Sequence, residues 1–93
     1  MAVLNLDRMK SRNDEIMKYI KEAEEKDARI SENLERIFYC IREATMLLEM
    51  QKRDIKRLEH YQLQENHQSK IVQEIVAGYY SCMVRRDILV QRL

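Results

Sequence analysis

Apolar side chains recur along the first two thirds of the chain at alternating steps of three and four residues. A spacing that averages 3.5 residues is typical of a helix that buries one stripe against another helix in a left-handed coiled coil. The pattern predicts one long helix over about residues 2–60, with a seam that contains fourteen apolar residues in seventeen positions. The seam positions are Ala2, Leu6, Met9, Asn13, Ile16, Ile20, Ala23, Asp27, Ile30, Leu34, Ile37, Ile41, Ala44, Leu48, Gln51, Ile55 and Leu58.

The faces away from this seam carry acidic residues placed four positions before basic ones. Each such pair stabilises an exposed helix by about 0.2–0.5 kcal/mol. The pairs are Asp14–Lys18, Glu22–Lys26, Glu25–Arg29, Glu32–Arg36 and Glu49–Arg53. They indicate a solvated helix surface rather than a catalytic one.

Three polar residues interrupt the seam, namely Asn13, Asp27 and Gln51. A polar residue at a seam position costs stability but can fix the register and the number of partner helices. Asn13 and Gln51 are the candidates for this specificity-setting role. The alternative is that the seam frays or faces water at these points, which the weak seam around Ala23 favours for Asn13 and Asp27.

The last third of the chain predicts a shorter helix over about residues 70–93. Residues 59–70 are almost wholly polar, and the apolar content then returns over a broad face. In one arrangement the chain bends within 60–70 and the second helix packs back, antiparallel, on residues 36–58. In the other, the helix is continuous, because no Gly or Pro marks a turn and the seam resumes in phase at Val72, Val76, Tyr79, Met83, Val90 and Leu93.

The segment IFYCIREATMLLEM, residues 37–50, is apolar on nearly every side of a helix. This pattern predicts a bundle of three or more helices at that level, supplied by partner chains as well as by this one. Phe38 is expected in the core, whereas Tyr80 is either a core residue or an interface anchor. The predicted partner-facing residues are Ile16, Ile20, Ile30, Leu34, Ile37, Ile41, Leu48, Ile55, Leu58, Val72, Val76, Tyr79 and Met83.

Composition places all 93 residues in a single all-α domain, since the chain has no Pro and one Gly. Seventeen basic and sixteen acidic side chains leave a net charge of +1. The chain therefore lacks the one-sided basic surface of a nucleic-acid-binding protein, and we expect the KRDIKR run at 52–57 to be a solvated face. No segment approaches the roughly 20 apolar residues of a membrane span, and no secretory signal is apparent. Two distant cysteines predict a reducing compartment, the cytoplasm or the nucleus.

The sequence offers no arrangement typical of catalysis, and we expect a non-enzymatic protein without a cofactor or metal. His60 and His67 lie seven residues apart, wider than the i, i+4 spacing common for metal ligands on a helix. Cys40 and Cys82 lack a neighbouring Cys or His pattern and are expected to be buried as small apolar groups.

The stretch LLEMQKRDIKRLEH sets Gln51 between apolar layers at Leu48 and Ile55. It resembles the central glutamine layer of Q-type SNARE helices, and the resemblance covers about thirty residues. This resemblance implies a four-helix bundle that drives membrane fusion. The layers that should follow Leu58 depart from the pattern, because Gln62, Glu65 and Ser69 occupy them.

These observations predict a helical subunit that binds partner helices as a scaffold or tether in a multi-chain assembly. A small helical chaperone that masks a client helix is the first alternative, and a SNARE-like fusion helix is the second.

Overall fold

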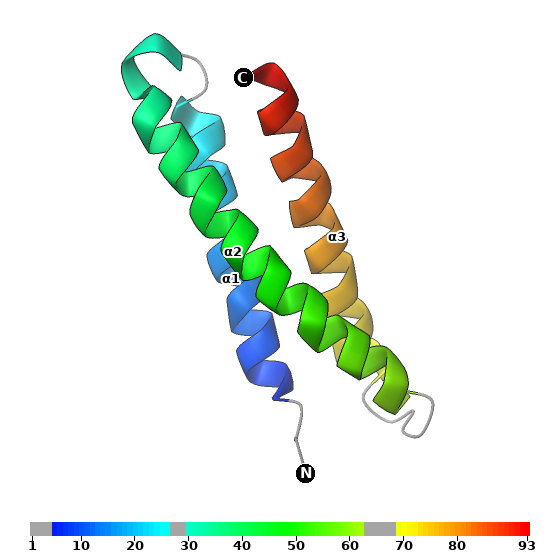
Figure 1. The fold of residues 1–93 in the computed structure, drawn as a ribbon. Coiled ribbons are helices and arrows are strands. Elements are labelled where there is room, and N and C mark those ends of the chain that lie inside the picture. The colour runs from blue at the N-terminus through cyan, green and yellow to red at the C-terminus, as the bar shows by residue number, and fades with distance from the viewer. Residues whose placement is uncertain (1–4, 27–29, 63–68) are drawn as a thin grey trace.

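The computed structural model contains three helices, shown in Figure 1: α1 (Leu6–Lys26), α2 (Ile30–Gln62) and α3 (Ser69–Arg92). The structure describes residues 5–26, 30–62 and 69–93. Within these ranges all secondary structure is helical, as the composition predicts. Asp27, His67 and the 63–68 part of the predicted bend lie outside the described residues, as does the side chain of Ile30.

Helix α1 begins at a side-chain cap that Asn5 provides. The Oδ1 atom of Asn5 accepts a hydrogen bond from the backbone N–H of Arg8 at 3.0 Å. Asn is among the residues that best satisfy the free N–H groups of a first helical turn. Asp7 in the first turn and Lys26 in the last complement the helix dipole. The described part of the first helix begins at Leu6, and residues 2–4 of the predicted range, Ala2 among them, lie outside the described residues.

The prediction of one helix over residues 2–60 is wrong, because α1 and α2 divide this range and lie side by side in antiparallel directions (Figure 1). Two ion pairs show that the directions are opposite. Arg12, near the start of α1, binds Asp54 near the end of α2, whereas Glu22, near the end of α1, binds Arg36 near the start of α2. Folding back allows each half of the seam to bury the other half within one chain. A heptad stripe by itself does not distinguish this arrangement from a long helix that pairs with another chain.

Helix α3 returns antiparallel to α2, so the hairpin is the arrangement that the structure adopts (Figure 1). Arg86 donates a hydrogen bond to Oγ1 of Thr45 at 3.2 Å, which sets these two residues at the same level of the bundle. Helix α3 also contacts α1 through Lys10–Glu74 and Arg85–Glu24 ion pairs. Each helix therefore contacts the other two.

The core lies along the axis between the three helices. The buried apolar residues are Met9, Ile16, Ile20, Ala23, Ile37, Cys40, Ala44, Leu48, Ile55, Leu58, Val72, Ile75, Tyr79, Cys82 and Leu89. The expectation that Phe38 belongs to the core is wrong: its side chain is exposed, because residues 37, 40, 44 and 48 define the inward face of α2 at that level. Part of the apolar surface of residues 37–50 therefore stays uncovered by this chain.

Candidate partner-binding site

A layer of polar side chains crosses the core and joins all three helices. We call Arg12, Asn13, Gln51 and Asp54 the polar layer. Gln51 is completely buried, and its Nε2 atom donates to the backbone oxygen of Met9 at 2.9 Å and to Oδ1 of Asn13 at 2.6 Å. Its Oε1 atom accepts from Arg12 at 3.3 Å. A buried amide that makes all these bonds avoids the cost of unpaired polar groups.

Asn13 extends the polar layer from α1 to α3. Its Nδ2 atom donates to the backbone oxygen of Ile75 at 2.8 Å. The approach depends on Gly78, because a Cβ atom built there would lie 2.6 Å from Nδ2 of Asn13. Gly in the middle of a helix costs about 1 kcal/mol relative to Ala. The single Gly of the chain therefore makes room for the hydrogen bond that holds α1 and α3 together.

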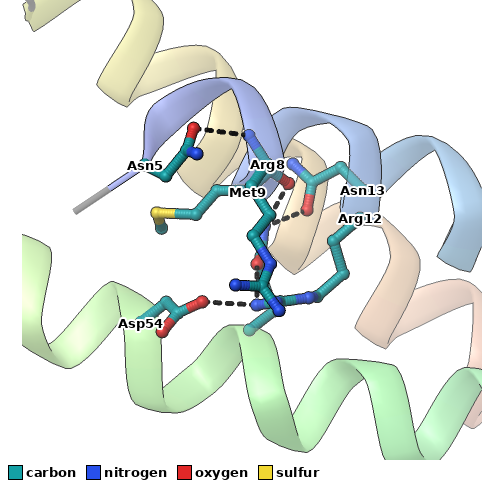
Figure 2. Close-up of polar contacts among 7 residues, drawn as sticks. Asn5, Arg8, Met9, Arg12, Asn13 and Asp54 are labelled. Carbon is teal, nitrogen blue, oxygen red and sulfur yellow. Dashed lines mark hydrogen bonds and ion pairs between the residues drawn. The ribbon is translucent and has the colours of Figure 1, made fainter. Parts of the chain in front are cut away.

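Arg12 and Asp54 complete the layer with an ion pair at its edge (Figure 2). The Arg12 side chain is 9% exposed and that of Asp54 is 23% exposed. A desolvated guanidinium needs its counter-ion, since removal of one partner of a buried pair leaves an uncompensated charge. The pair favours the one alignment of α1 on α2 that places Asp54 beside Arg12.

The two predicted specificity-setting residues, Asn13 and Gln51, thus meet each other inside one chain. The SNARE resemblance implied that the glutamine layer would be completed by other helices, but in this structure α1 of the same chain supplies the hydrogen-bond partners of Gln51. Sequence reasoning missed the roles of Arg12, Asp54 and Gly78. The solitary Gly inside a helical pattern was the available signal, since such a residue often has a packing reason.

Charge pairs at the rim hold the helices on either side of this layer. Arg85 forms an ion pair with Glu24 and donates to the sulfur of Met17 at 2.8 Å. Nε of Arg36 donates to Glu22 at 2.7 Å, and this hydrogen bond lowers the pKa of the Glu22 carboxyl. Such partly exposed pairs contribute little stability each, but they agree with the alignment that the polar layer favours.

Most of the residues predicted to face partner chains are covered by this chain itself. Ile41, Val76 and Met83 are partly buried, and Leu34 is exposed. The buried members of the set are Ile16, Ile20, Ile37, Leu48, Ile55, Leu58, Val72 and Tyr79. A site for another protein must therefore use side chains outside the core.

Three such side chains, Tyr80, Val84 and Ile88, lie on the face of α3 that points away from α1 and α2. This outer face of α3 consists of Gln73, Ala77, Tyr80, Ser81, Val84, Ile88 and Gln91, all of them exposed. At 3.6 residues per turn these positions lie opposite the buried side of the helix and extend over about 27 Å. None of these seven residues is charged, although the exposed Lys70 lies on the same side one turn before Gln73 and the exposed Asp87 lies at the edge beside Tyr80. Tyr80, Val84 and Ile88 are 49%, 53% and 45% exposed. The outward side of a surface helix is normally rich in charge, and an uncharged stretch with four apolar residues in seven is closer to the composition of an interface.

Helix α2 also exposes apolar side chains, but charged residues separate them. Met46 and Met50 lie between Arg42, Glu49 and Arg53 on the surface. Phe38 is flanked by Glu35 and Arg42. Single exposed apolar residues are common on soluble proteins and indicate no site by themselves. The outer face of α3 is therefore the better candidate.

The groups that could carry chemistry are dispersed. Cys40 and Cys82 are free and buried, and burial raises the pKa of each thiol. The described residues contain no cluster of three or more His, Cys, Asp or Glu side chains suited to a metal ion. Nor does any helix in the described ranges have the length and apolarity to cross a membrane.

Comparison with protein-family models, with curated proteins and with solved structures finds no match. The function must therefore be inferred from the geometry of the three helices.

Proposed function

We propose that this protein is a non-enzymatic helical subunit that binds partner helices through the outer face of α3 and acts as a scaffold or tether. The observation that carries the proposal is that the centre of this face, from Gln73 to Gln91, bears no charge in a chain with seventeen basic and sixteen acidic side chains. Five turns of exposed, uncharged and partly apolar surface would be costly to leave in water, and a partner would remove it from water.

The spacing on the outer face favours a helix as the partner. Ala77, Ser81, Val84, Ile88 and Gln91 follow one another at steps of four, three, four and three residues. This is the spacing by which one helix packs along another in a coiled coil. The proposed assembly is a larger helical bundle in which α3 packs on helices at both of its faces. The free, buried thiols suit a reducing compartment such as the cytoplasm or the nucleus.

The polar layer supports this proposal by giving α3 a fixed position. Asn13 and Gly78 hold the middle of α3 against α1, and Tyr80 and Val84 lie within two turns of that contact. A binding surface on a helix that is itself held rigidly loses less entropy on association.

The test uses a Val84→Glu chain, with Met46→Glu as the matched control because Met46 is 56% exposed on α2. Each chain is purified together with its natural partners, and native mass spectrometry gives the mass of the complex. We expect the wild-type and Met46→Glu chains in assemblies larger than 11.3 kDa and the Val84→Glu chain alone. An isolated wild-type chain, or a Val84→Glu chain that keeps every partner, would contradict the proposal.

A further inference from the structure

Two of the charged residues that flank the outer face of α3, Glu74 and Arg92, are placed symmetrically along one of its edges, whereas Asp87 lies at the other edge and pairs with Arg86. Glu74 and Arg92 are eighteen residues apart, which equals five turns, so both project from the same edge of the face. Glu74 stands at the N-terminal end of this edge and Arg92 at its C-terminal end. Both residues are exposed, and the pair that Glu74 makes with Lys10 is a surface contact at 3.3 Å.

We propose that the partner of this face is the same face of a second copy of the chain, packed antiparallel about a two-fold axis near residues 82 and 83. This inference rests on the proposed function, since it names the helix that α3 binds. Antiparallel packing brings Glu74 of each copy opposite Arg92 of the other. The axis creates both contacts together, so Glu74 and Arg92 are complementary at the two ends.

The apolar positions are complementary about the same axis. At equal distances from it, the small Ala77 faces the larger Ile88 of the second copy, and Ser81 faces Val84. Small residues opposite large ones allow two helices to interdigitate without voids. A parallel pair would instead place Glu74 against Glu74 and Arg92 against Arg92, which repel. A two-fold contact of this kind closes on itself and gives a dimer rather than a filament.

Sedimentation equilibrium of the purified chain tests the dimer. The wild type should be dimeric at micromolar concentration, and Val84→Glu should raise the dissociation constant at least about tenfold because it buries two charges near the axis. The matched control Met46→Glu should leave the dissociation constant unchanged. Circular dichroism must show equal helix content in all three chains, which separates lost association from lost folding.

Charge exchange tests the direction of packing. Glu74→Arg alone places like charges together at both ends and should weaken the dimer by roughly threefold to tenfold, the range expected for two exposed pairs. Adding Arg92→Glu restores opposite charges and should return the dissociation constant to within about twofold of the wild type. Equal affinity of the Glu74→Arg chain and the wild type would overturn the antiparallel arrangement.

A wild-type chain that stays monomeric even at hundreds of micromolar would overturn the second copy as partner. The proposed function would survive that result if Val84→Glu still released a different helical protein from the chain. Both proposals fail together only if the chain is a monomer with no partner that depends on Val84.

Discussion

The side-chain amide nitrogen of Asn13 lies against Gly78, where any other residue would have a Cβ atom. A Cβ atom built on residue 78 would be 2.6 Å from Nδ2 of Asn13. A buried side chain on α1 thus restricts which residue α3 can carry at that point. The two residues are close in space although they are far apart in the sequence. The effect of substituting one of them on the free energy of unfolding should therefore depend on which residue occupies the other position.

Replacing Gly78 with Ala should destabilise the fold by about 1–2 kcal/mol. Ala is favoured over Gly in a helix by about 1 kcal/mol, but the new methyl group must displace Asn13 and break its bond to the Ile75 carbonyl. The free energy of unfolding from urea titration, at a concentration below any self-association, measures the difference.

The same substitution in a chain that carries Asn13→Ala should have the opposite sign. Without the amide, the methyl group introduced by Gly78→Ala meets only ordinary contacts such as the Cβ atom of residue 13 at 3.7 Å, and the helix gains about 0.5–1 kcal/mol. If Gly78→Ala were destabilising in both backgrounds, the contact with Asn13 would not be the reason for the glycine.

Replacing Gln51 with Leu should cost about 1–3 kcal/mol, although Leu has a similar size and is apolar. The change leaves Oδ1 of Asn13 and the Met9 carbonyl without their buried donor. Thermal and urea unfolding of the purified chain measure the loss. Lys56→Leu on the exposed surface of α2 is the matched control and should change stability by less than about 0.5 kcal/mol. A neutral Gln51→Leu chain would mean that the layer contributes packing alone.

A double-mutant cycle on Arg12 and Asp54 should show strong coupling. Asp54→Ala leaves the guanidinium with Gln51 as its remaining partner, and we expect a loss of about 1–3 kcal/mol, reduced from the fully buried case because Asp54 is partly exposed. Arg12→Leu combined with Asp54→Ala should cost less than the sum of the single changes. Strict additivity would show that the ion pair contributes nothing to the position of α1.

The two thiols should react slowly in the folded protein. Burial raises the pKa of both Cys40 and Cys82, and the thiolate is the reactive form. At pH 8 we expect iodoacetamide to modify both residues at the rate of unfolding, and rapidly in urea. A fast-reacting Cys82 would show that α3 separates from α1 in the native state.

The same raised pKa values make stability depend on pH in the alkaline range. The unfolded chain releases the thiol protons of Cys40 and Cys82 at lower pH than the folded chain does. The contribution of the two buried thiols to the free energy of unfolding is therefore fully present below the pKa that a thiol has in the unfolded chain. It is lost as pH rises through the higher pKa that the thiols have in the folded chain. Urea titrations at a series of alkaline pH values should show this decline, and it should be smaller in a chain that carries Cys40→Ala and Cys82→Ala.

Composition predicted the all-helical class, and the hydrophobic pattern predicted much of the core. Of the seam residues in the described ranges, Ile16, Ile20, Ile37 and Leu48 are buried as a stripe with this spacing requires. Leu34 is an exception, since it lies near the start of α2 and is 39% exposed. The periodicity specifies which side of each helix is buried but does not specify which helix covers it.

The division between α1 and α2 was not predictable from the pattern, because the spacing stays in phase from Met9 to Leu58. The outer face of α3 was missed for a related reason. In the sequence, Tyr80 belongs to the same broad apolar face as Ile75, Tyr79 and Cys82, yet only the last three are buried. The positions of α1 and α2 around α3 separate the buried residues from the exposed one, and the sequence pattern does not contain those positions.

The continuity of the polar layer across three helices has a consequence for how the molecule opens. Separation of α1 would leave the Gln51 amide and the Arg12–Asp54 pair without partners, and separation of α3 would remove the acceptor that Ile75 offers to Asn13. Detachment of any one helix breaks hydrogen bonds that the polar layer makes with the other two. Opening one helix should therefore cost nearly as much free energy as unfolding the whole molecule. Amide protons at the centres of all three helices should then exchange with solvent at one common free energy, as a single cooperative unit.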